Sequence, residues 1–129
     1  MKILVVDDSA SDLKLMERIV STLGHEVITH VGPFGTVAEV TKQRPDVVLL
    51  DLEMPGLRGD SLADLVSRPR ASGHSPAVVF LSGAELEVLE DAYKRTKVRG
   101  AIRKGSASEM KLELRKLLDQ IALDRASDT

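Results

Sequence analysis

The chain contains no cysteine, which excludes disulfide bonds, thiol catalysis and metal sites built from thiolates. It also lacks a long basic tract, and its formal net charge of -2 gives no general attraction for nucleic acid. No apolar run approaches the roughly 20 residues that a membrane span requires. The chain opens directly on a strand-like segment, which leaves no room for a signal peptide. These absences predict a cytoplasmic protein that binds neither membranes nor nucleic acid.

What is present is the composition of an ordinary globular domain. The chain has 129 residues, 43% hydrophobic and 29% charged, which is enough for one core without covalent cross-links. Strand-like and helix-like segments alternate from end to end, as is typical of βαβ units. We expect one domain over residues 1–123 and a short polar tail over 124–129 that frays. The expected strands cover about 2–6, 26–31, 47–50, 77–81 and 98–102.

The segments between these strands carry helix signals. The first helix is expected to begin near Ser9 and to end before Gly24, a typical C-terminal glycine. Capping boxes start further helices at Thr36 and Ser106. Apolar residues at helical spacing predict the faces that pack on the sheet. They are Leu13, Met16, Ile19, Val20 and Leu23 in the first helix, Leu62, Leu65 and Val66 in the third, Leu86, Leu89 and Tyr93 in the fourth, and Met110, Leu114, Leu117, Leu118 and Ile121 in the fifth.

The strands read as nearly continuous apolar runs, which is expected when helices cover both faces of a sheet. Right-handed crossovers leave few topologies. We therefore expect an α/β protein with a flavodoxin-like, doubly wound parallel sheet of five βα units, in strand order 2-1-3-4-5. Such sheets bind ligands beyond the carboxyl ends of the strands, where the first and third strands are neighbours in this order.

Residues suited to phosphoryl chemistry follow four of the strands, namely Asp7, Asp8, Asp51, Ser82 and Lys104. Two carboxylates about 4 Å apart repel by roughly 1 kcal/mol in water and about 4 kcal/mol at the effective dielectric of a protein surface. A fold does not gather three of them for stability. Mg²⁺ relieves this repulsion, prefers oxygen ligands and accepts phosphate oxygens. Asp7 alone is equally well explained as a helix cap or a solvated loop residue, but the set favours a metal and phosphoryl site.

Asp51 is the candidate nucleophile, because a carboxylate at the end of a buried strand can accept a phosphoryl group as an acyl phosphate. Lys104 would neutralise charge on one phosphoryl oxygen, and Ser82 would donate a hydrogen bond to another. Glu53 is either close to the path of an attacking water or a solvated loop residue. The three histidines show no metal-ligand spacing.

Over about Met1 to Leu123 the chain resembles the receiver domain of two-component response regulators. The resemblance rests on short patterns that occur in the family's order and at its intervals: Asp7-Asp8, Asp51 with Met54-Pro55-Gly56, Ser82-Gly83-Ala84, and Lys104. It implies a stand-alone, bacterial-type response regulator that is a phosphoprotein of two-component signal transduction.

The resemblance also implies a role for each matching residue. Asp51 would accept a phosphoryl group from a phosphohistidine on a partner histidine kinase or phosphotransfer protein. Mg²⁺ would be held by Asp8, Asp51 and the backbone carbonyl of Glu53, with Asp7 acting mainly through a metal-bound water. Ser82 and Lys104 would engage the phosphoryl oxygens. Phosphorylation would then bias an equilibrium between two conformations.

Two positions depart from the family pattern. The fifth-strand residue that is commonly Tyr or Phe is Ala101 here, so switching by an aromatic rotamer cannot operate at this position. The proline that normally follows the lysine is replaced by Gly105. Because a non-proline cis bond costs about 2.5–4 kcal/mol, we expect a trans or strained bond before Gly105 and a softer loop. Both changes affect the usual output route and leave the acceptor site intact.

Partner surfaces follow from the same resemblance. It implies no enzyme activity beyond self-phosphorylation from phosphodonors and autodephosphorylation, so the chain would act by docking to another protein or by phosphorelay. The kinase would contact the first helix at Ala10, Leu13, Lys14 and Glu17. A downstream effector would contact the fourth helix, the fifth strand and the fifth helix.

Two other functions compete with this interpretation. A receiver-like adaptor that acts without phosphorylation is favoured by Ala101 and Gly105 but not by the intact acceptor residues. A phosphatase of the haloacid dehalogenase type requires Asp-x-Asp after the strand, whereas this chain has Asp51-Leu52-Glu53 and no cap domain. A dinucleotide-binding role is disfavoured because the first turn is acidic and lacks the glycine fingerprint.

Overall fold

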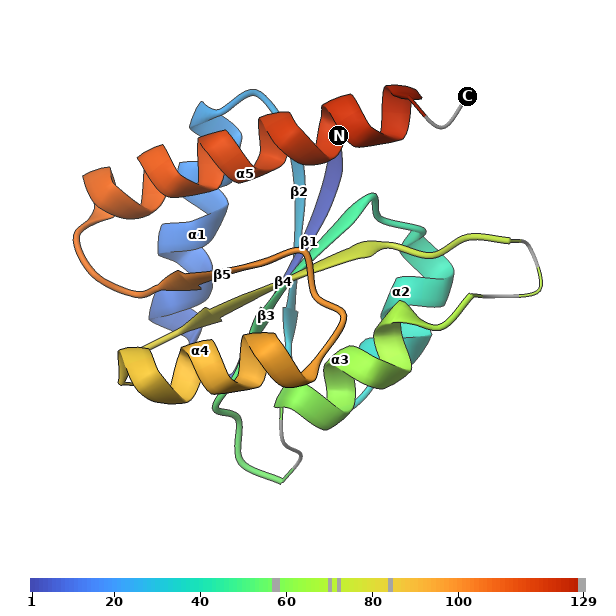
Figure 1. Cartoon of the computed structure of the whole chain (residues 1–129), viewed down its shortest axis with the longest axis horizontal. Coiled ribbons are helices and arrows are strands. Elements are labelled where there is room, and N and C mark those ends of the chain that lie inside the picture. Colours follow the sequence, from blue (N-terminus) through green and yellow to red (C-terminus); the bar gives the residue numbers. More distant parts are fainter. Residues whose placement is uncertain (57–58, 70, 72, 84, 128–129) are drawn as a thin grey trace.

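The computed structural model of the chain describes residues 1–56, 59–69, 71, 73–83 and 85–127, and the side chains of residues 59, 60, 86, 89 and 95 lie outside that description. Within the described residues, strands and helices alternate in five pairs (Figure 1). In chain order they are β1 (Lys2–Asp7), α1 (Ala10–Thr22), β2 (Glu26–Val31), α2 (Thr36–Gln43), β3 (Val47–Asp51), α3 (Gly59–Ser67), β4 (Ala77–Ser82), α4 (Leu86–Arg95), β5 (Gly100–Arg103) and α5 (Ala107–Ser127).

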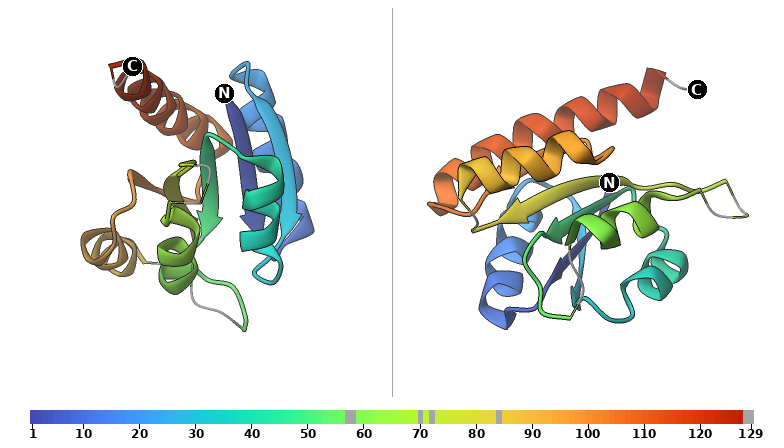
Figure 2. Two further views of the ribbon diagram at one scale, coloured as in Figure 1. Left: turned by 90° about the vertical axis from the view of Figure 1, so that its right-hand side faces the viewer. Right: turned by 60° about the horizontal axis from the view of Figure 1, so that its bottom comes forward.

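The strands form one parallel sheet in the order β2-β1-β3-β4-β5, which confirms the predicted topology. Figure 2 shows β1, β2 and β3 pointing in the same direction, away from the end of the molecule where both termini lie. β1 and β3 are neighbours, with Val6 opposite Leu50. The residues that follow these two strands therefore leave the sheet side by side.

Both faces of the sheet are buried, and side chains alternate between two core clusters. In β1, Ile3 and Val5 belong to one cluster, whereas Leu4 and Val6 belong to the other. α1 and α5 cover the first cluster, and α2, α3 and α4 cover the second. Figure 1 shows these two groups of helices on opposite sides of the sheet. Burial of both faces explains why the strand sequences are apolar at consecutive positions.

The N-termini of α1 and α5 are capped by the residues that the sequence predicts, whereas the N-terminus of α2 is not. Ser9 caps α1 by accepting a hydrogen bond from the Asp12 amide, and the Ser106 hydroxyl accepts one from the Glu109 amide at 3.2 Å. The capping box predicted at Thr36 is wrong. Gly35, with φ of 81°, is the N-cap residue of α2, and the Thr36 hydroxyl donates to the Pro33 carbonyl at 2.6 Å. The left-handed turn that glycine permits starts the helix one residue earlier.

Two residues predicted to lie in the core are partly exposed. Leu65 is 40% exposed, because Leu62, Ala63 and Val66 supply the inward face of α3. Tyr93 is 43% exposed, and Ala92 takes the buried position on α4. The predicted contributions of Leu86 and Leu89 fall on side chains outside the described part of the structure.

The C-terminal helix is longer than the sequence predicts. α5 continues through Ser127, so residues 124–127 are helical, and residues 128–129 lie outside the description. Arg125 Nη1 donates to the carbonyl and the carboxylate of Asp46 at 3.2 and 3.3 Å, and Arg99 forms an ion pair with Asp124. These contacts tie the last turns of α5 to the rest of the domain. None of the described helices has the length and apolar character needed to cross a membrane.

Candidate functional site

An acidic cluster lies at the carboxyl edge of the sheet. Asp7 ends β1, Asp51 ends the neighbouring β3, and Asp8 begins the loop to α1. One carboxylate oxygen from each residue lies within 4.8 Å of the others. Asp7 and Asp51 are buried, with 1% and 4% of each residue exposed, whereas Asp8 is exposed. The pairing of β1 with β3 therefore brings Asp51 to Asp7 and Asp8, which precede it by more than 40 residues in the sequence.

Lys104 joins this cluster from the loop after β5. Its Nζ lies 2.8 Å from Asp7 Oδ2, 2.8 Å from Asp12 Oδ2 and 3.6 Å from Asp51 Oδ2. The Lys104 amide donates to the Ser82 carbonyl at 2.8 Å, which extends the β4–β5 pairing by one residue and fixes where the side chain begins. The peptide bond between Lys104 and Gly105 is trans. One ammonium thus sits among three carboxylates.

Asp12 is the member of this arrangement that the sequence analysis missed. The sequence places Asp12 only in the first turn of the helix after β1. In the structure that turn overhangs the carboxyl edge of the sheet, and the Asp12 carboxylate reaches Lys104. The sequence does contain one signal for this role, since Asp12 is an acidic residue one helical turn beyond Asp8. A helix that starts at the edge of the sheet has its first turn close to the site.

The titration of the cluster is set by burial and by Lys104. Burial raises the pKa of Asp51 to about 7, and the negative charge of Asp7 adds to this rise, while the hydrogen bond from the Glu53 amide opposes it. Burial alone would raise the pKa of Asp7, but hydrogen bonds from Lys104 and from the Ser9 amide lower it. Burial alone would lower the pKa of Lys104, but Asp12, Asp7 and Asp51 raise it. Without a metal, burial therefore favours the protonated form of Asp51 up to about neutral pH.

Ser82 and Glu53 occupy the same edge of the sheet. Ser82 ends β4, which pairs with β3 so that Asp51 is opposite Leu81, and the Ser82 side chain is fully buried. Glu53 is exposed, and its backbone amide donates to Asp51 Oδ1 at 3.2 Å, which orients the Asp51 carboxylate. Of the Ser82-Gly83-Ala84 pattern, Ala84 lies outside the described residues.

The cluster fits a magnesium ion. Mg²⁺ binds oxygen ligands at about 2.1 Å, so two of its ligand atoms are separated by at most roughly 4.2 Å. The three carboxylates, whose oxygens already lie within 4.8 Å of one another, meet this condition after small side-chain rotations. Asp8 is exposed, so its carboxylate can turn towards an ion without disturbing the core. Among the described residues, the histidines bond elsewhere, to the N-terminal amine, the Phe34 carbonyl and the Pro45 carbonyl.

The surface predicted to meet a kinase needs one correction. Ala10, Lys14 and Glu17 are exposed on α1. Leu13 is 6% exposed and packs in the core that α1 shares with α5. Its inclusion in the kinase surface is therefore wrong, whereas the helical spacing that placed it on the same face as Met16 and Val20 is confirmed.

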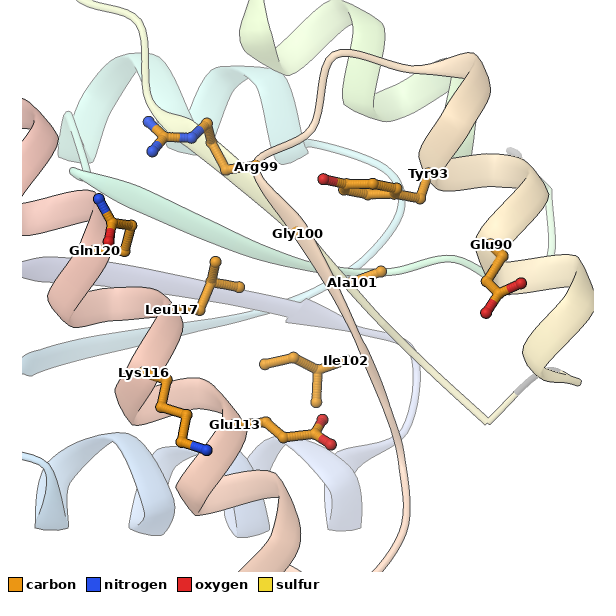
Figure 3. Close-up of a pocket in the computed structure, with 10 residues that line it drawn as sticks. All are labelled: Glu90, Tyr93, Arg99, Gly100, Ala101, Ile102, Glu113, Lys116, Leu117 and Gln120. Atoms are coloured by element: carbon orange, nitrogen blue, oxygen red, sulfur yellow. The ribbon is translucent and has the colours of Figure 1, made fainter.

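A separate hollow lies between α4, β5 and α5, away from the carboxylates. It has a volume of about 630 Å³, and Figure 3 shows Ala101 and Gly100 between Tyr93 of α4 and Leu117 of α5. Glu90, Glu113 and Lys116 lie around it. The small residue at position 101 leaves open the space into which a larger side chain would project.

The sheet order, the covering helices and the residues at the strand ends are those of a phosphoryl-signalling receiver domain. The family model described as response regulator receiver domain matches residues 3–115, so this chain belongs to that family. Receiver domains are signalling domains, and they work with kinases, phosphotransfer proteins and effectors.

Individual relatives agree with this assignment. The chain is similar to Protein PilH of Pseudomonas aeruginosa, with 30% identity over 78 residues (60% of this chain, 64% of that protein). Protein PilG of the same organism is 27% identical over 82 residues (64% and 61%), and sporulation initiation phosphotransferase F of Bacillus subtilis is 27% identical over 92 residues (70% and 72%). The chain thus spans less than two thirds of the length of PilG and PilH.

Solved structures show the same fold. NtrX from Brucella abortus superposes with a TM-score of 0.81 at 27% identity, over 98% of this chain and 28% of that one. The chemotaxis response regulator CheY4 of Vibrio cholerae gives a TM-score of 0.75 at 25% identity, over 93% of this chain and 97% of that one. The flavodoxin-like class expected from the sequence is therefore confirmed.

Proposed function

We propose that this chain is a phospho-acceptor module in which Asp51 receives a phosphoryl group from a phosphohistidine on a partner kinase or phosphotransfer protein. A carboxylate oxygen of Asp51 forms a bond to phosphorus while the bond from phosphorus to the imidazole nitrogen breaks, and the imidazole keeps the electron pair. The observation that carries the proposal is the buried Asp51 carboxyl at a strand end, surrounded by Asp7, Asp8 and Lys104.

The neighbouring residues support this chemistry in distinct ways. Asp8, Asp51 and the backbone carbonyl of Glu53 would hold Mg²⁺, with Asp7 contributing through a metal-bound water. When bound, the ion would supply positive charge to the transferring phosphoryl oxygens. The Glu53 amide keeps Asp51 oriented, and the cation would favour the ionised carboxylate that the attack requires.

Lys104 and Ser82 would bind the phosphoryl oxygens after transfer. Lys104 Nζ is 3.6 Å from Asp51 Oδ2, so a small movement of its side chain towards Asp51 would bring it to an oxygen of a phosphoryl group on that residue. Ser82 ends the adjacent strand and would donate a hydrogen bond from its hydroxyl. No further catalytic activity is required, because autodephosphorylation needs only a water at the same centre.

Signalling would follow by docking to a partner or by transfer of the phosphoryl group onward. The exposed side of α1, with Ala10, Lys14 and Glu17, is the proposed surface for the phosphodonor. The hollow between α4, β5 and α5 is the proposed effector surface. Since position 101 is alanine, the response to phosphorylation would be a rearrangement of α4 and of the loop at Gly105 rather than rotation of an aromatic ring.

The test is incubation of the purified protein with acetyl phosphate and Mg²⁺, followed by intact mass spectrometry. We expect one phosphoryl adduct, which chelation with EDTA prevents. An unchanged mass with Mg²⁺ present would instead support an adaptor that binds partners without phosphorylation.

A second expected result concerns metal binding alone. Mg²⁺ at about 100 times its dissociation constant stabilises a protein by about 2.7 kcal/mol, so the melting temperature should rise. Asp8→Ala should remove most of this rise because it deletes a proposed ligand, and it should leave the fold intact because Asp8 is exposed. The matched control is Glu26→Gln, an exposed acidic residue at the start of β2, at the opposite end of the sheet. Identical shifts in Asp8→Ala and wild type would contradict the metal site.

A further inference from the structure

Lys104 is held away from Asp51 by two other carboxylates. Its ammonium nitrogen makes hydrogen bonds of 2.8 Å to Asp7 Oδ2 and of 2.8 Å to Asp12 Oδ2, whereas Asp51 Oδ2 is 3.6 Å away. A hydrogen bond from an ammonium to a carboxylate is about 2.7–2.9 Å long. The contact with Asp51 is therefore an ion pair only, and two of the three ammonium hydrogens are already used.

The two carboxylates that hold Lys104 differ in their burial and in the elements that carry them. Asp7 is buried at the end of β1, and its other oxygen accepts the Ser9 amide at 3.0 Å. Asp12 belongs to α1, its side chain is 39% exposed, and its own amide is capped by Ser9 Oγ at 3.3 Å. Asp7 is part of the proposed metal site, but Asp12 lies one helical turn outside it.

We propose that Asp12 is a positioning residue that holds Lys104 in its unphosphorylated arrangement, so that Asp12 competes with a phosphoryl oxygen on Asp51 for the ammonium group. The inference rests on the proposed acceptor role of Asp51. Asp12 stabilises the unmodified state and not the phosphorylated one, so it shifts the equilibrium against phosphorylation. The charge of Asp12 does not act on Asp51 directly. It acts through Lys104, which takes part in both the unphosphorylated and the phosphorylated state.

The consequence is a measurable competition. A ligand that draws Lys104 away from a partly exposed ion pair loses up to the free energy of that pair, which is commonly at most about 1 kcal/mol, or about fivefold in affinity. Asp12→Asn should therefore bind the phosphoryl analogue beryllofluoride, in the presence of Mg²⁺, about fivefold more tightly than wild type. Glu26→Gln is the control and should bind as wild type does.

A double-mutant cycle separates this mechanism from simple charge repulsion. Lys104→Met removes the group through which Asp12 acts, so Asp12→Asn should change beryllofluoride affinity little when Lys104→Met is also present. The same gain in both backgrounds would overturn the inference, because Asp12 would then be repelling the anion through space. Equal affinities of wild type and Asp12→Asn would overturn it as well.

A measurement without metal or phosphoryl analogue tests the contact itself. Exchange of the Lys104 ammonium hydrogens with water, followed by nitrogen-detected NMR, should be several-fold faster in Asp12→Asn than in wild type or Glu26→Gln. Equal exchange rates would contradict the role of Asp12 in holding Lys104. A wild-type protein that binds no beryllofluoride with Mg²⁺ would instead contradict the acceptor site, so the two failures are distinguishable.

Discussion

Asp51→Asn is expected to abolish the phosphoryl adduct that acetyl phosphate and Mg²⁺ produce on the wild-type protein. The amide of asparagine is a far weaker nucleophile than a carboxylate, and no neighbour is placed to replace it. Both carboxylate oxygens of Asp7 accept hydrogen bonds, one from Lys104 and one from the Ser9 amide. Asp8 is exposed and lies after β1, not at the buried end of β3 where Asp51 lies. Intact mass spectrometry of both proteins after the same incubation measures the effect, which should be a change from one adduct to none.

Loss of the adduct must be separated from loss of the fold. The substitution removes a charge from a site that is 4% exposed and retains the shape of the side chain, so Asp51→Asn should remain folded by circular dichroism. Glu26→Gln should still become phosphorylated, since it lies at the other end of the sheet. Persistence of the adduct in Asp51→Asn would place the acceptor elsewhere in the chain.

Most of this site could be predicted because it depends on strand ends. Apolar runs of four to six residues locate the strands, and a parallel sheet puts all their carboxyl ends at one edge. Asp7, Asp51 and Ser82 each follow such a run, and Lys104 follows the less apolar fifth strand, so their convergence follows from the topology and needs no knowledge of side-chain packing. The strand order, which decides that β1 and β3 are adjacent, came from the handedness of the crossovers and from the family resemblance.

What could not be predicted depends on how helices sit on the sheet. Asp12 and Lys104 are 92 residues apart, and their contact is set by the height of the first turn of α1 above the end of β5. No local pattern encodes that height. The exposure of Leu65 and Tyr93 has the same origin. Each lies beside the buried face of its helix, and the rotation of that helix about its axis decides whether such a residue packs on the sheet or faces solvent. Ala101 was identified from sequence, but the hollow beside it appears only when α4 and α5 are in place.

The free energy of unfolding of the metal-free protein is expected to fall as the pH rises from about 4 to about 7. The pKa of Asp51 is raised from its ordinary value of 3.8 to about 7 in the folded chain, chiefly by burial. Between these values the folded state holds a proton that the unfolded state releases, so this contribution is full below about 4 and is lost as pH passes 7. At about 1.4 kcal/mol for each pH unit, the loss is at most roughly 4 kcal/mol.

Other members of the cluster do not cancel this trend. The pKa of Asp7 is lowered, so its stabilising contribution is lost only as pH falls below its ordinary value of 3.8, outside the window that Asp51 governs. Asp51→Asn has no proton to release at this position, so it should lack this fall and its stability should exceed that of wild type most at the alkaline end. Burial lowers the pKa of His25, which raises stability with pH in both proteins and therefore cancels in the comparison. Urea denaturation in EDTA across this pH range, on both proteins, measures the difference.

Mg²⁺ should reverse the slope, and this makes the experiment decisive for the site. A bound cation favours the ionised carboxylates, so the metal-saturated protein should gain stability as Asp51 loses its proton and the site becomes able to bind. Wild-type stability that rises with pH in EDTA would mean that Lys104, 3.6 Å from Asp51, outweighs burial and keeps this carboxyl ionised. In that case the acceptor would need no metal to become nucleophilic, and the dependence of phosphorylation on Mg²⁺ would have to come from stabilising the transferring phosphoryl group alone.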